Sequence, residues 1–108
     1  MLALFEKYSQ TSEERKHKIH PLLINKSAYL VFDKIAKYLA EEGYANLTLN
    51  KNFLEIYCTD YGFEITVIVS SEDEATALVN ASVYGEKKRG RTRSRLKKFI
   101  LEIDRLFV

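Results

Sequence analysis

The sequence has few of the residues that build covalent or metal-bound frameworks. Its 108 residues include one cysteine, one proline, four glycines and no tryptophan. A single cysteine excludes an intramolecular disulfide, and it excludes a four-thiolate zinc site within one chain. The few glycines and the single proline predict short connections between secondary structure elements. The fold must therefore depend on a packed core.

Long apolar runs and targeting signals are also missing. The most apolar stretches, such as 65–69, are far shorter than a membrane span. The first residues lack the positive charge, long apolar stretch and small-residue cleavage site of a signal peptide. Hydrophobic residues make up 46% of the chain and charged residues 30%. This composition predicts one folded domain over residues 1–108, in the cytoplasm, with no membrane partner.

Motifs that carry catalysis or bind cofactors are absent as well. The chain has no glycine-rich phosphate loop, no Gly-x-Ser-x-Gly sequence and no paired cysteines. His17 and His20 have the spacing of one helix face, but basic residues surround them and Pro21 follows, so we expect a solvated pair and no metal. Cys58 alternates in phase with apolar residues and is expected in the core. We therefore expect no catalytic residues and no cofactor.

Two segments have the spacing of amphipathic helices. Residues 26–42 follow a capping Asn25 or Ser27, and Gly43 is placed to end that helix. Residues from about 93 to 107 form the second helix, with its apolar residues on one stripe. The N-terminal residues 1–20 are ambiguous, helical or extended, although Thr11 could begin a short helix.

Between these helices, apolar and polar residues alternate in four strand-like runs. The runs cover 45–49, 54–59, 63–69 and 77–84, and the segments 50–52, 60–62 and 70–74 connect them. Short connections between alternating runs predict an antiparallel meander. The predicted fold class is α+β: a four-stranded antiparallel β-meander with an N-terminal and a C-terminal helix packed on one face, in the order α-β-β-β-β-α.

The other face of this sheet is expected to be partly apolar. Its predicted residues are Glu55, Tyr57, Thr59, Glu64, Thr66, Ile68, Leu78 and Tyr84. Such a face is either covered by the N-terminal segment or used as an interface, and a two-fold homodimer is one such use.

A cationic segment, residues 87–98, is the strongest functional signal. It holds eight of the 17 lysines and arginines and no acid, whereas the other nine face all 15 acids and leave the rest of the chain at net −6. Clustered cations attract polyanions, and arginine binds phosphate through its bidentate fork. The predicted nucleic-acid-binding residues are Lys87, Lys88, Arg89, Arg91, Arg93, Arg95 and Lys98.

Three functions are compatible with these patterns. The favoured one is a small non-enzymatic protein that binds nucleic acid, DNA or RNA, through the cationic segment. The second is a structural or regulatory interaction module, a homodimer formed through the open sheet face. The third is a small metal-dependent nuclease, in which Glu55, Asp60 and Glu64 would hold a divalent cation. The cationic segment could instead serve solubility, or balance the acidic connection at 70–74.

Overall fold

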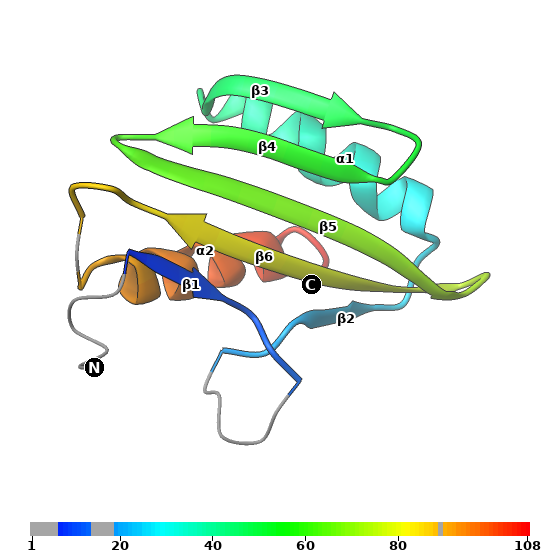
Figure 1. Cartoon of the computed structure of the whole chain (residues 1–108). Coiled ribbons are helices and arrows are strands. Elements are labelled where there is room, and N and C mark those ends of the chain that lie inside the picture. Colours follow the sequence, from blue (N-terminus) through cyan, green and yellow to red (C-terminus); the bar gives the residue numbers. More distant parts are fainter. Residues whose placement is uncertain (1–6, 14–18, 89) are drawn as a thin grey trace.

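The computed structural model describes residues 7–13, 19–88 and 90–108, and these form one α+β domain (Figure 1). In chain order the elements are β1 (Tyr8–Gln10), β2 (Leu22–Ile24), α1 (Ala28–Glu41), β3 (Ala45–Asn50), β4 (Glu55–Asp60), β5 (Phe63–Asp73), β6 (Thr76–Tyr84) and α2 (Thr92–Arg105). Every strand pairing is antiparallel. Neither helix is long and apolar enough to cross a membrane, as far as the described residues go.

The sheet has six strands, not the four that the sequence predicts. The order β1-β6-β5-β4-β3 contains the predicted meander, and β2 also pairs with β6. The two additional strands share the outer edge of β6: Tyr8 lies opposite Tyr84, and Leu22 lies opposite Val79. Thr11 is therefore not the start of a helix. Its backbone N–H donates to the carbonyl of Ala81 at 2.9 Å, which continues the ladder beyond β1.

Both helices cover the same face of the sheet, as predicted (Figure 1). Ser27 caps α1 by accepting from the backbone N–H of Leu30 at 3.4 Å, and Gly43, at φ +82°, follows the end of the helix. One continuous core joins helix residues such as Phe32 and Phe99 to the inward residues of β4, β5 and β6. Because Cys58 belongs to this core and is fully buried, its pKa rises to about 12.

Two connections differ from the sequence-based boundaries. Residues 70–73, expected in a polar connection, continue β5, because Ser70 and Ser71 pair with Leu78 and Ala77 on β6. Leu54, expected in a strand, lies in the β3–β4 turn at φ +50°. The edge strand β3 has an irregularity of its own: its register with β4 shifts between Ala45 and Thr48. Such a bulge disturbs the regular hydrogen-bond ladder of an edge strand and so disfavours pairing with further strands.

Candidate nucleic-acid interface

The cationic segment connects β6 to α2 at one end of the sheet. Lys88 N–H donates to the carbonyl of Gly85 at 3.2 Å, and Arg91 N–H donates to the carbonyl of Lys88 at 3.0 Å. Two successive turns thus lead into α2, and Gly90 lies within the second of them at φ +78°, where residues with a side chain are strained. α2 then begins at Thr92, with no side chain capping its first amides.

The side chain of Lys88 packs this connection against the neighbouring β4–β5 turn. Its Nζ lies 5.7 Å from the ring centroid of Phe63. The Lys88 side chain also crosses Gly62 closely, since a Cβ built there would come within 3.0 Å of the lysine Cε. Lys88 is accordingly half-buried, and it holds the two turns together.

Five other cations of the segment point into solvent. They are Lys87, Arg91, Arg93, Lys97 and Lys98, and we call them the cationic surface. Arg93 and Lys97 are one helical turn apart and share a side of α2. Within residues 7–13, 19–88 and 90–108, none of the five side chains has a hydrogen bond or an ion pair with another residue. Arg89 is outside the described residues.

Arg95 differs from the other predicted contact residues, because its guanidinium group points inward. Its Nη2 lies 2.8 Å from Oδ2 of Asp60 and donates to the Tyr44 hydroxyl at 2.7 Å. Only 11% of the Arg95 side chain is exposed. Burial by itself lowers the pKa of Arg95, but the hydrogen bonds to Tyr44 and Asp60 outweigh it and raise the pKa. Arg95 thus joins α2 to the end of β4.

A carboxylate about two helical turns beyond Arg95 on α2 completes a polar network. Glu102 accepts hydrogen bonds from the hydroxyls of Tyr38, at 2.8 Å, and Tyr44, at 2.7 Å. Burial and the bond to Glu102 raise the pKa of Tyr38 to about 12, and they raise that of Tyr44 as well. The Arg95–Asp60–Tyr44–Glu102 network therefore ties α2 to the end of α1 and to β4, beneath the start of the cationic surface.

We expect the Asp60–Arg95 pair to contribute strongly to stability. Replacing Asp60 by alanine leaves the guanidinium group of Arg95 buried without its counter-ion, and should lower the free energy of unfolding by about 2–3 kcal/mol. The double variant D60A/R95M should recover part of this loss, because it also removes the orphaned charge. Urea unfolding of the single and double variants measures the coupling free energy between Asp60 and Arg95. Equal losses in D60A and in the double variant would contradict an energetic role for the pair.

The acidic connection lies at the far end of the β5–β6 hairpin from the cationic segment. Asp73 is opposite Thr76 beside the hairpin turn, whereas Glu64 is opposite Tyr84 at the other end. A strand of this length separates the two ends by about 30 Å. The acids around residues 72–74 therefore do not neutralise the cationic surface by contact, and Asp60 is the acid that binds an arginine of the segment.

The structure does not bring the predicted metal-binding carboxylates together. Asp60 is bound to Arg95, and Oε1 of Glu64 accepts a hydrogen bond from the Tyr57 hydroxyl at 2.9 Å. In the part of the chain that is described, no three histidine, cysteine, aspartate or glutamate residues gather where they could hold a metal. His20 Nδ1 lies 3.1 Å from the carbonyl oxygen of Ser12, and His17 is outside the described residues.

The sheet face opposite the helices has the residues that the alternation predicts. The strand register places Tyr57 beside Thr66, and Ile68 beside Asn80. No helix or strand of the described residues lies over this face (Figure 1). Tyr57 and Tyr84 donate hydrogen bonds to Glu64 and Glu86, and these bonds raise the pKa of both hydroxyls. Those two tyrosines are therefore fixed by neighbouring carboxylates.

No protein family model, no curated protein and no solved structure matches this chain. The geometry of the site is therefore the basis of the functional argument. It gives a small α+β domain with five exposed cations between residues 87 and 98 and a sheet face that no described helix or strand covers.

Proposed function

We propose that this protein is a non-enzymatic nucleic-acid-binding protein whose cationic surface contacts phosphates. The observation that supports the proposal is the outward position of Lys87, Arg91, Arg93, Lys97 and Lys98, without a neutralising partner among the described residues. Unpaired cations on one surface attract a polyanion and release its counter-ions when they bind. Five cations are enough for several simultaneous phosphate contacts.

Two features of the fold favour phosphate over an isolated acidic side chain. The cationic surface extends over the turn at 87–91 and about 10 Å of α2, the rise of seven helical residues. Its cations therefore suit a ligand with repeated charges. In addition, the side chain of Arg91 does not cap α2, and the positive end of a helix dipole favours an anion next to Arg91 and Arg93. Arg95 has no place in this surface, because Asp60 and Tyr44 bind its guanidinium group.

A binding titration against single-stranded and duplex DNA and RNA, at about 0.05 M and 0.2 M salt, tests the proposal. With about five phosphates neutralised, log K on duplex DNA should fall with log salt at a slope of roughly −4 to −5. The absence of binding to every nucleic acid at the lower salt concentration would exclude the proposed function.

The second candidate is a homodimer formed through the open sheet face. It is favoured by apolar side chains on or beside that face, such as Leu23, which is 63% exposed, and Ile68, which is 43% exposed. Light scattering over a range of protein concentrations tests it. A dimer that dissociates in an Ile68→Glu variant would support this candidate, and a monomer at high concentration would exclude it.

A further inference from the structure

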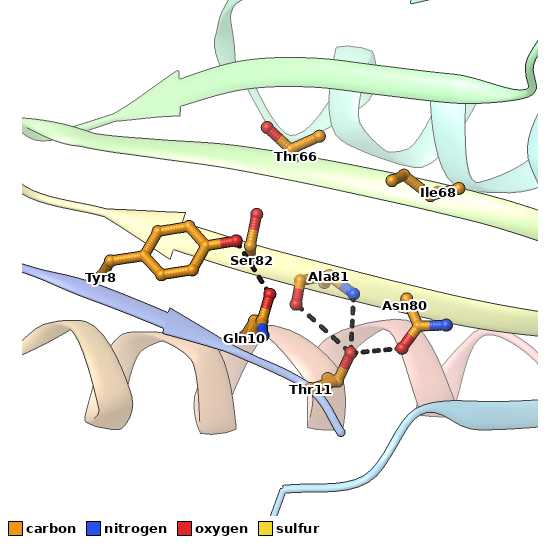
Figure 2. A pocket seen from close by; sticks show the side chains of 8 residues that line it. All are labelled: Tyr8, Gln10, Thr11, Thr66, Ile68, Asn80, Ala81 and Ser82. Carbon is orange, nitrogen blue, oxygen red and sulfur yellow. Dashed lines mark hydrogen bonds between the residues drawn. The ribbon is translucent and has the colours of Figure 1, made fainter. Parts of the chain in front are cut away.

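The open sheet face contains a hollow of about 260 Å³ between β1, β5 and β6 (Figure 2). The hollow forms beside the end of β1, where Gln10 is the last residue paired with β6 and Thr11 follows it. Thr11 fixes its floor, because its hydroxyl accepts from the N–H of Ala81 at 3.1 Å and donates to Oδ1 of Asn80 at 2.8 Å. Hydrogen bonds between Thr11 and β6 therefore hold the floor of the hollow in place.

Uncharged hydrogen-bonding groups surround this hollow. Tyr8 donates to Oε1 of Gln10 at 3.0 Å, and the amide NH₂ of Gln10 has no hydrogen bond to the part of the chain that the structure describes. Asn80 likewise uses its Oδ1 and keeps its NH₂. The hydroxyls of Thr66 and Ser82 have no hydrogen bond to any described residue. The remaining wall is formed by the Tyr8 ring and Ile68, so polar groups and apolar surface line the same small space (Figure 2).

These groups have the chemistry that recognises a nucleobase. A base is flat, apolar on its two faces, and carries carbonyl oxygens and ring nitrogens on its edge, which match an aromatic wall and amide or hydroxyl donors. The volume is below the range of most ligand pockets, which leaves room for one ring system. Among the described residues, no charged side chain lines the hollow, so none of them offers a counter-ion to a carboxylate or a phosphate there.

The hollow lies near the end of β6 from which the cationic segment starts, although α2, with three of the five cations, covers the opposite face of the sheet. Ser82 lies three residues before Gly85, where the chain leaves the sheet for the cationic segment, a distance of about 10 Å along β6. Glu86 stands near this path, but Nζ of Lys7 lies 2.9 Å from its Oε1 and offsets its charge. Glu64 also stands beside this path, opposite Tyr84, and its Oε1 accepts a hydrogen bond from the Tyr57 hydroxyl at 2.9 Å. A strand that runs from the cationic surface to the hollow therefore passes these two carboxylates at the end of β6.

Resting on the nucleic-acid binding proposed above, we infer that the hollow holds one unpaired base of a single strand whose phosphates lie on the cationic surface. In a duplex the bases are stacked and paired inside the helix and cannot enter the hollow. The ligand class is therefore single-stranded nucleic acid, bound by phosphate contacts at one end of the sheet and by a base on its open face.

Fluorescence anisotropy with labelled strands of about 12 nucleotides tests this inference. The probes are oligo-dT, oligo-U, an abasic strand of equal charge and a duplex. The wild-type protein should bind one of the base-bearing strands about tenfold more tightly than the abasic strand, because one base gains stacking and hydrogen bonds. This ratio of affinities should fall to about one in Tyr8→Ala, while binding to the abasic strand should stay unchanged.

Two further variants keep the test independent of folding. The double variant T66V/S82A removes two unpaired hydroxyls from the hollow with little change of shape, and it should reduce the same ratio severalfold. Tyr29→Ala is the matched control: it removes an exposed tyrosine, 64% accessible, from α1 on the helical side of the domain, and should leave the ratio unchanged. Circular dichroism verifies that each variant is folded.

Three results would overturn the inference, and they differ in what else they exclude. Equal affinity of the wild-type protein for base-bearing and abasic strands would exclude the base site while the phosphate surface remains. No binding to any probe would exclude the proposed function as well. A dimer that Tyr8→Ala dissociates would assign the hollow to a contact between two copies of this chain.

Discussion

Replacing Phe99 by alanine is expected to lower the free energy of unfolding by about 3–5 kcal/mol, the largest stability effect that we predict. Phe99 has no solvent-exposed surface and packs in the core that joins α2 to the sheet. Its ring also meets that of Tyr44 edge to face, with 6.1 Å between centroids. The variant leaves a cavity at this point and removes the aromatic contact beneath the Arg95 guanidinium group.

Leu101→Ala is the matched control, because it shortens an apolar side chain of the same helix that is 55% exposed. Its effect should stay within about 1 kcal/mol. Chemical unfolding with urea measures both variants, and the slope with denaturant should be similar for the two. A loss below about 1 kcal/mol for Phe99→Ala would show that the apolar stripe of α2 does not hold the helix on the sheet.

Much of this architecture can be predicted because it depends on local periodicity. The stripe through Leu96, Phe99 and Ile103 and the alternation through Ile65, Val67 and Val69 each persist long enough to fix which side faces the core. Both helices have a single apolar stripe, so they share the one sheet face that also has apolar residues. Phe99 accordingly lies in one buried cluster with Val67 and Val69.

The two edge strands could not be predicted by the same means. β1 and β2 have three residues each, too few to show an alternating period. Their extended conformation depends on the free edge of β6, which is some 55 to 75 residues away along the chain and supplies partners such as Val83 and Val79. For the same reason, nothing in the sequence indicates the hollow that forms between β1, β5 and β6.

The inward position of the Arg95 side chain could not be predicted from the sequence either. Arg93 and Arg95 are two residues apart in the same basic run, and only the rotation of α2 separates an outward from an inward side chain. The partner of Arg95, Asp60, is 35 residues earlier, at the end of β4, which the fold places beside α2. Composition therefore predicted a charged surface, but tertiary contacts decide which charges remain available to a ligand.

The outward arginines are expected to control binding. Replacing Arg91 and Arg93 together by alanine should flatten the plot of log K against log salt by up to about 2 units, one for each lost phosphate contact. Two contacts fewer correspond to roughly 50-fold weaker binding to nucleic acid at about 0.1 M salt, since each contact changes the slope by about 0.9. The free energy of unfolding should change by less than about 0.5 kcal/mol, because both side chains are exposed.

Two control variants separate position from total charge. Lys26→Ala with Lys51→Ala removes the same number of exposed cations from connections outside the cationic segment, and should leave the salt dependence nearly unchanged. Arg95→Met removes a cation within the segment that already has Asp60 as its counter-ion, so it should affect stability without flattening the slope. If all three variants flattened the slope equally, binding would follow net charge alone, and the cationic surface would not be the contact site.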